Sequence, residues 1–116
     1  MNMPGNEAHN SLVTCLCDAW EALDADQIEP LLAEDLHYWS WWLMKETHTK
    51  KEYMEYIRGR FKAMKNSGEF PIVKIGVNRL DGEYAVAIQQ GDSLPALIRI
   101  IEKDGKIHDM WMQAAE

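Results

Sequence analysis

Residues 19–39, AWEALDADQIEPLLAEDLHYW, decide the fold that this sequence predicts. The stretch begins inside an amphipathic helix expected over residues 10–25, whose apolar side chains recur every three or four residues. Ile28, Leu31 and Leu32 predict a short second helical turn at residues 28–32, and Pro30 is tolerated there because it lies near the helix start. The dense aromatic side chains of residues 36–43 favour a strand. The stretch therefore predicts two helices followed by the first strand.

A third helix is expected over residues 49–66. Thr49 and Glu52 fit a capping box, in which the two side chains satisfy backbone N–H groups at a helix start. Apolar residues then recur at spacings of four, four and three from Tyr53 to Met64, and Gly68 supplies a stop. Together these signals predict a helix over the whole segment.

The remainder of the chain has the alternating pattern of strands. Four strands are expected, at residues 71–80, 84–90, 95–103 and 106–113. Short turn-forming segments such as Asp81-Gly82 separate them, which favours hairpins. Helices early in the chain and strands late indicate an α+β domain, in which the helices cover one face of a curved antiparallel sheet.

Length and composition exclude several classes of protein. The 116 residues suit a single domain over 1–116, with residues 1–9 expected as a loosely ordered N-terminal tail. No apolar run approaches the roughly 18 residues of a membrane span, and the N-terminus lacks the features of a secretory signal. We therefore expect a cytoplasmic protein. A net charge of −7 disfavours nucleic acid as a partner, and we expect no membrane partner either.

Motifs for metals, cofactors and nucleophilic catalysis are not found in the sequence. Cys15 and Cys17 lie two apart in an expected helix, so their side chains diverge and we expect two separate thiols. The sequence contains no Cys/His metal spacing, no glycine-rich phosphate loop and no Ser-His-Asp order. We therefore expect neither a metal nor a cofactor.

The quoted stretch resembles the opening of the nuclear transport factor 2-like superfamily, in particular its SnoaL-like members. The closing Asp104-Gly105-Lys106-Ile107 before the last strand is also similar to that superfamily. The resemblance implies a cystatin-like cone, in which a curved antiparallel sheet wraps around three N-terminal helices and encloses a pocket. It leaves the function open, because this fold is used by isomerases, dehydratases, cyclases, hydrolases and noncatalytic dimer modules.

The catalytic residues of known superfamily members are largely missing from the matching positions. The three ketosteroid isomerase positions hold Ser40, Ala19 and Leu97, none of which can perform that chemistry. The Arg-x-Asp pair of the epoxide hydrolases would fall at Arg99, but its acid is absent. The paired pocket histidines of scytalone dehydratases remain open as a comparison, with His37, His48 and His108 available.

Alternation along the first strand separates its side chains into two faces. Tyr38, Ser40 and Trp42 share one face, and Trp39 and Trp41 share the other. The resemblance implies that the first face lines the pocket and binds a ligand, while the second lies on the outer surface of the sheet. Because this superfamily often dimerises there, we expect a homodimer through Trp39 and Trp41. The alternatives are the opposite register, or a loop or third layer that covers both tryptophans.

Arg99 is a charge within a largely apolar expected strand. If it shares the pocket face with Tyr38 and Ser40, it would bind a carboxylate or enolate-bearing ligand. The alternative is a cross-strand ion pair with Asp109 or Glu83.

His108 is the candidate for a catalytic base, with Tyr38 as acid or oxyanion donor. Alternation would place His108 on one face with Met110 and Met112, which the resemblance turns inward. The alternative is a half-buried histidine without a chemical role. Met110 and Trp20 are expected as pocket wall, and both equally suit the core.

These observations lead to three functional hypotheses. The first is a homodimeric protein that binds a small, partly apolar or anionic molecule in its pocket. The second is a cofactor-free isomerase, dehydratase or cyclase that transfers protons in the same pocket. The third is an association module without a ligand.

Overall fold

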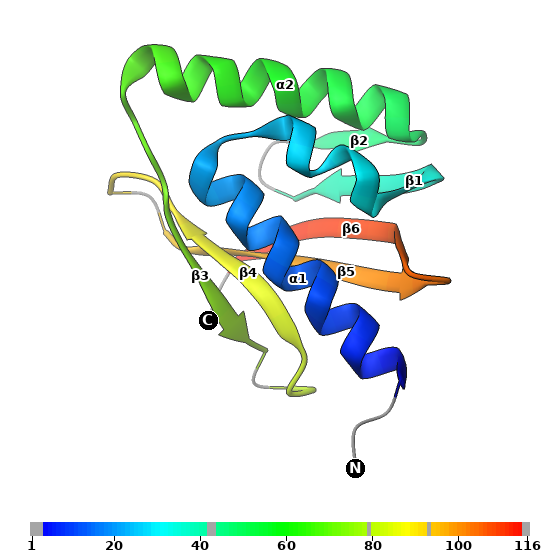
Figure 1. The fold of residues 1–116 in the computed structure, drawn as a ribbon. Coiled ribbons are helices and arrows are strands. Elements are labelled where there is room, and N and C mark those ends of the chain that lie inside the picture. The colour runs from blue at the N-terminus through cyan, green and yellow to red at the C-terminus, as the bar shows by residue number, and fades with distance from the viewer. Residues whose placement is uncertain (1–3, 42–43, 79, 93, 115–116) are drawn as a thin grey trace.

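The structure is a computed structural model that describes residues 4–41, 44–78, 80–92 and 94–114, and its fold is α+β (Figure 1). In chain order the elements are α1 (Pro4–Ala22), the 3-10 turns η1 (Ala25–Gln27) and η2 (Glu29–Leu31), β1 (Leu32–Ser40), β2 (Lys45–Thr47), α2 (Lys50–Ser67), β3 (Ile72–Val77), β4 (Tyr84–Gln89), β5 (Ala96–Lys103) and β6 (Lys106–Ala114).

The strands form one curved, open sheet in the order β2-β1-β6-β5-β4-β3. The expected four-strand meander is confirmed, since β3, β4, β5 and β6 pair antiparallel in succession. The expectation of a wholly antiparallel sheet is wrong, because β1 lies parallel to β6 and makes the sheet mixed. Parallel neighbours need a long connection, and everything from β2 to β5 lies between these two strands in the chain.

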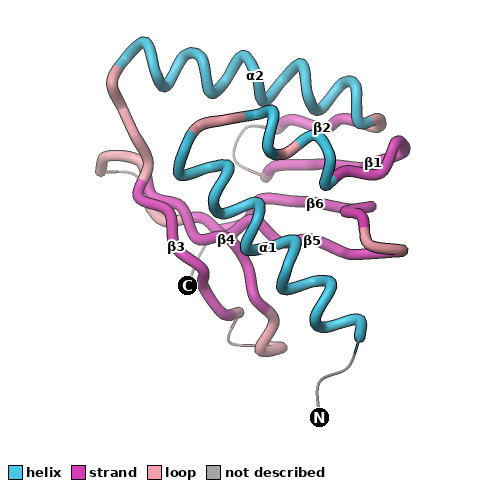
Figure 2. Tube along the Cα trace, in the orientation of Figure 1, coloured by secondary structure: helices cyan, strands magenta, loops and turns pink. Residues whose placement is uncertain are grey.

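Both α-helices lie on the same face of the sheet (Figures 1 and 2). Helix α1 packs across β3, β4 and β5, and α2 packs over β1 and β2. The buried core lies between this helical layer and the sheet. It contains large side chains from every layer, such as Trp20 of α1, Ile57 of α2 and Met110 of β6. We refer to the helix-covered side of the sheet as the inner face and to the opposite side as the outer face.

Three local expectations are corrected by the structure. Helix α1 begins at Pro4, so residues 4–9 are helical instead of a loose tail, and proline is tolerated there because the first helical turn needs no N–H partner. The expected short second helix is the pair of 3-10 turns, η1 and η2. Strand β2 was not expected, because three residues are too few to reveal alternation.

The predicted capping box at the start of α2 is confirmed. The Thr49 Oγ1 accepts a hydrogen bond from the Glu52 backbone N–H at 3.1 Å. The Glu52 carboxylate in turn accepts one from the His48 backbone N–H at 3.0 Å. The helix ends at Gly68, whose φ of 75° lies in the left-handed region that glycine adopts without strain. None of the described helices combines the length and apolarity needed to cross a bilayer.

Candidate functional site

Three tyrosines meet where α2 crosses β1. Tyr38 projects from the inner face of β1, and Tyr53 and Tyr56 come from successive turns of α2. The ring centroid of Tyr38 lies 4.9 Å from that of Tyr53 and 5.8 Å from that of Tyr56. Tyr38 and Tyr53 are only 2% and 1% exposed, whereas Tyr56 is half-buried. The cluster therefore extends from the core to the surface.

Arg60 connects this cluster to Gln90, the residue that follows β4. Its Nη1 donates a hydrogen bond to the Tyr56 hydroxyl at 3.1 Å, and its Nη2 donates one to Gln90 Oε1 at 3.0 Å. The guanidinium carbon also lies 5.4 Å from the centroid of the Trp20 ring, a cation–π distance. We call Tyr38, Tyr53, Tyr56 and Arg60 the tyrosine–arginine cluster.

Burial keeps the inner phenols of the cluster protonated. Desolvation is the main cause that raises the pKa of Tyr38 far above its ordinary value, and the neighbouring Tyr56 adds to it. The pKa of Tyr53 is raised by the same dominant cause. Tyr38 also exchanges side-chain hydrogen bonds with Tyr56 and Ser40. At neutral pH these groups are hydrogen-bond donors and carry no charge.

Two buried polar atoms near this region have no hydrogen-bond partner among the residues that the structure describes. They are the indole N–H of Trp20 and the hydroxyl of Thr47, which is the register partner of Tyr38 on β2. A buried polar group left unpaired costs about 1–3 kcal/mol. A ligand with complementary polar atoms would recover part of that cost.

Four of the predicted ligand-site residues are buried. Tyr38, Ser40 and Met110 are buried on the sheet, and Trp20 is buried in α1. Their role in ligand binding stays a prediction. Trp42, which was predicted to join them, lies outside the described residues.

Arg99 is not on the pocket face, so the prediction that it binds a ligand there is corrected. Its register partner is Trp111 on the outer face, and its guanidinium carbon lies 5.4 Å from the centroid of that indole ring. It also forms ion pairs with Asp81 and Glu83. The Glu83 pair is one of the two alternatives derived from the sequence. Arg99 points outward because its neighbours Ile98 and Ile100 occupy the inner face.

His108 also fails to share the face of Met110. The pairing of β5 with β6 shifts register after Ile101, so alternation is interrupted and Ile107 and Met110 are both buried. His108 is half-buried, and its Nδ1 lies 3.4 Å from the carboxylate of the exposed Asp35. The proposed base is therefore separated from Tyr38. A bulge adds one residue to a strand, and hydrophobic alternation alone does not reveal where it falls.

Sequence reasoning missed Tyr56, Arg60 and Gln90. Tyr56 and Arg60 are four residues apart on α2 and thus share one side of the helix. That spacing was a usable signal, but both residue types also suit a solvated helix surface. Gln90 follows β4, and only the folded sheet brings it to Arg60.

Aromatic side chains also form a row on the outer face. The indoles of Trp39 and Trp111 stack with centroids 5.1 Å apart and an interplanar angle of 5°. Trp41, just beyond β1, is 68% exposed. The predicted outward placement of Trp39 and Trp41 thus agrees with the structure, and their role in a dimer interface stays a prediction.

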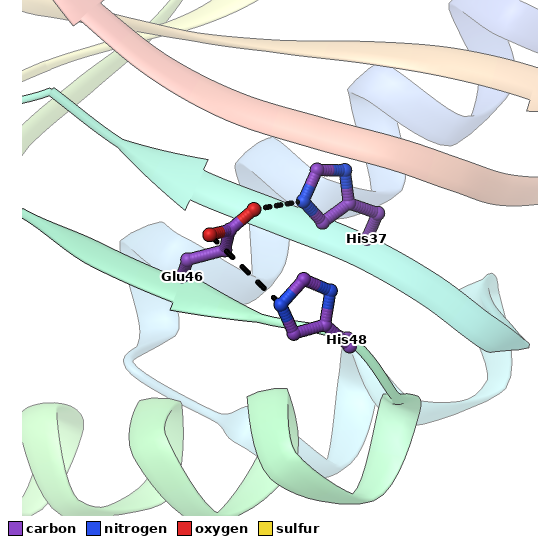
Figure 3. A group of neighbouring side chains, drawn as sticks. All are labelled: His37, Glu46 and His48. Carbon is purple, nitrogen blue, oxygen red and sulfur yellow. Dashed lines mark hydrogen bonds and ion pairs between the residues drawn. The ribbon is translucent and has the colours of Figure 1, made fainter.

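A second polar group lies at the edge of the outer face, where β1 meets β2 (Figure 3). The side chains of His37, Glu46 and His48 each offer a possible metal ligand, and these ligand atoms lie within 4.8 Å of one another. The His37 and His48 rings are stacked, with centroids 5.1 Å apart. Beside this group is a surface pocket of about 430 Å³, whose lining includes His37, Trp39, Trp41 and Glu46.

Comparisons with known proteins identify the fold. No protein-family model and no curated protein sequence matches the chain. Solved structures do match. A SnoaL-like protein of unknown function from Burkholderia thailandensis has a TM-score of 0.71 and 16% sequence identity, over 95% of this chain and 97% of that one.

Two further structures give the same result. An LEH-like epoxide hydrolase from M. tuberculosis has a TM-score of 0.68 and 19% identity, covering 97% of this chain and 86% of that one. An NTF2-like protein of unknown function from Cytophaga hutchinsonii has a TM-score of 0.67 and 15% identity, covering 92% and 89%. The chain therefore has the nuclear transport factor 2-like fold. Identities this low establish the fold alone.

Proposed function

We propose that this nuclear transport factor 2-like chain binds a small, partly apolar molecule inside its cone, with the tyrosine–arginine cluster as the polar end of the site. The observation that carries the proposal is the Tyr38–Tyr56–Arg60 chain of polar groups, which runs from the buried interior to the surface. The unpaired Thr47 hydroxyl beside Tyr38 supports it, because a buried polar atom of this kind has capacity for a ligand.

The chemistry of the cluster defines the ligand class. Neutral phenols and a guanidinium are hydrogen-bond donors, and a guanidinium pairs well with a carboxylate. Further aromatic side chains lie in the core beside the cluster, including Trp20 and Phe61, whose ring centroids are 4.9 Å apart. Aromatic walls with a few convergent donors favour a ring compound that carries a carbonyl or carboxylate.

Ligand entry requires movement of side chains at the surface end of the cluster. The inner residues Tyr38 and Ser40 are closed off from solvent, whereas Tyr56, Arg60 and Gln90 are half-buried. We infer that Arg60 exchanges its contacts with Tyr56 and Gln90 for contacts with the ligand. The exchange keeps the guanidinium hydrogen-bonded and therefore costs little.

A catalytic role in proton transfer is the alternative, and the interior favours it less. Tyr38 could act as a proton donor, and one structural neighbour is described as an epoxide hydrolase. However, the buried polar or charged side chains among the described residues are Ser40, Thr47 and Asn78, with no carboxylate or imidazole. Proton abstraction needs a base within hydrogen-bond reach of the substrate. The interior thus offers donors without a matching base.

The experiment uses the fluorescent aromatic anion anilinonaphthalene sulfonate as a probe of the site. Arg60→Met removes the guanidinium while keeping a similar stem, and we expect it to weaken saturable binding by about tenfold or more. Arg58→Met is the matched control, because Arg58 lies on the same helix and pairs with Asp26 and Glu29 on the surface. Equal losses in the two variants, or none in either, would contradict the proposal.

We also propose that the chain forms a homodimer through the outer face of the sheet. The support is the exposed Trp41 next to the stacked Trp39 and Trp111, since aromatic residues are enriched at interfaces. Light scattering after size exclusion measures the mass directly. Trp41→Ser is expected to convert dimer to monomer, whereas Phe70→Ser, at an exposed aromatic elsewhere in the chain, leaves the dimer intact. A monomeric wild type would overturn this proposal.

A further inference from the structure

Two strands bring three potential metal ligands to one place on the outer face. His37 lies on β1, Glu46 lies on β2, and His48 follows directly after β2. The antiparallel register pairs Trp39 with Glu46 and Tyr38 with Thr47, so the next pair outward is His37 with His48. Glu46 and His48 are two residues apart and therefore face the same side as His37. Figure 3 shows the three side chains converging there.

The ligand atoms are close to the spacing that a metal ion requires. The His37 Nε2 lies 2.5 Å from Glu46 Oε2, and the His48 Nε2 lies 3.9 Å from Glu46 Oε1. In a tetrahedral zinc site with bonds of about 2.1 Å, neighbouring ligand atoms are about 3.4 Å apart. One distance is shorter than this value and the other is longer. Rotation of exposed side chains is enough to adjust both.

The charges around the group favour a cation. The carboxylate of Glu46 lies 2.5 Å from the His37 Nε2 and 3.9 Å from the His48 Nε2, so it offers an anionic ligand beside both imidazoles. The Nδ1 of His37 lies 3.9 Å from the carboxylate of Asp109. A carboxylate behind a coordinating histidine orients the ring toward the ion, as occurs widely in metal sites.

The backbone at the third ligand is held in place by α2. The backbone N–H of His48 donates to the carboxylate of Glu52 at 3.0 Å, and Thr49 caps the helix immediately after it. His48 therefore combines a fixed main chain with a mobile side chain, which is 69% exposed. The His48 imidazole can therefore rotate to coordinate an ion while the backbone stays in place.

We propose that His37, Glu46 and His48 bind one divalent metal ion of the borderline class, represented by Zn²⁺. Two imidazoles and one carboxylate suit this class better than Mg²⁺ or Ca²⁺, which prefer oxygen ligands. Three protein ligands leave a fourth position open, as in catalytic zinc sites. The adjoining pocket of about 430 Å³ gives that position access to a small molecule. This site lies on the opposite face from the tyrosine–arginine cluster and does not depend on the function proposed for it.

Titration of the metal-free protein with Zn²⁺, followed by calorimetry, tests the proposal. We expect one ion per chain in the wild type. His48→Gln is expected to lower the affinity by at least about tenfold, because it removes one of three ligands at an exposed position that the fold does not need. Substitution with Co²⁺ adds a spectroscopic measurement, in which the visible bands report imidazole and carboxylate ligands in a four-coordinate site.

His108→Gln is the matched control, because His108 also pairs with a carboxylate, that of Asp35, but lies outside the group. This variant is expected to bind Zn²⁺ as the wild type does. The proposal is overturned if the wild type binds no Zn²⁺, or if His48→Gln binds it as tightly as the wild type. Thiolate bands in the Co²⁺ spectrum would likewise overturn it, since they would place the ion at the exposed Cys15.

Discussion

The rings of Tyr38 and Tyr53 lie 4.9 Å apart between β1 and α2, and both phenols are buried. Burial raises the pKa of each above the ordinary tyrosine value of 10.0. Above pH 10 the unfolded chain loses protons that the folded chain keeps. The contribution of the two phenols to the free energy of unfolding is therefore complete below pH 10. It falls as the pH rises above that value, by up to about 1.4 kcal/mol per pH unit for each phenol.

Alkaline denaturation followed by circular dichroism measures this dependence. Tyr53→Phe removes one of the two contributing phenols, so we expect a shallower loss of stability above pH 10 than in the wild type. Tyr84→Phe is the control, because Tyr84 is partly exposed at the start of β4. If the two variants have the same alkaline slope as the wild type, the interior phenols ionise normally and the proposed donor role fails.

The α+β class and most of the elements were predictable because their signals are local. Periodicity defined α2 and the meander, and the Thr49 cap marked the start of α2 within one residue. Strand β2 and the parallel pairing of β1 with β6 were not predictable in this way. A three-residue strand carries almost no pattern, and the direction of pairing depends on contacts between distant segments.

The candidate sites were only partly predictable for the same reason. Tyr38 and Ser40 were placed correctly because strict alternation holds at the end of β1. His108 was misplaced because of the register shift after Ile101. The grouping of His37 with Glu46 and His48 depends on the β1–β2 pair, so no sequence pattern brings the three together unless β2 is known.

Met110 is a fully buried residue of a central strand, and its truncation tests the core. Met110→Ala leaves a cavity between β6 and the helices, and we expect a loss of about 2–5 kcal/mol in the free energy of unfolding. Urea denaturation measures this quantity. Ile101→Ala, on the outer face where the side chain is half exposed, should cost much less. Comparable losses would mean that the outer face is as well packed as the interior.

The Thr49 cap should be worth a measurable amount of stability. Thr49→Ala leaves the Glu52 backbone N–H without its partner at 3.1 Å, and we expect a loss of about 0.5–2 kcal/mol in the free energy of unfolding. Thr14→Ala is a suitable comparison, because Thr14 is an exposed residue of α1 whose hydroxyl donates to the Asn10 carbonyl of the same helix. Its effect should stay within about 0.5 kcal/mol of zero. A larger effect at Thr14 than at Thr49 would contradict the capping box.

Arg99 and His108 were predicted from the sequence to line the ligand site, but both lie outside the tyrosine–arginine cluster. Both lie on the side of the sheet away from Tyr38, where Arg99 pairs with Asp81 and Glu83 and His108 pairs with Asp35. Arg99→Met and His108→Gln should therefore leave the binding of anilinonaphthalene sulfonate within about twofold of the wild type, in contrast to Arg60→Met. Fluorescence titration of all three variants provides the comparison. A loss at Arg99 or His108 that matches the loss at Arg60 would mean that the ligand occupies the outer face, and the assignment to the tyrosine–arginine cluster would have to be abandoned.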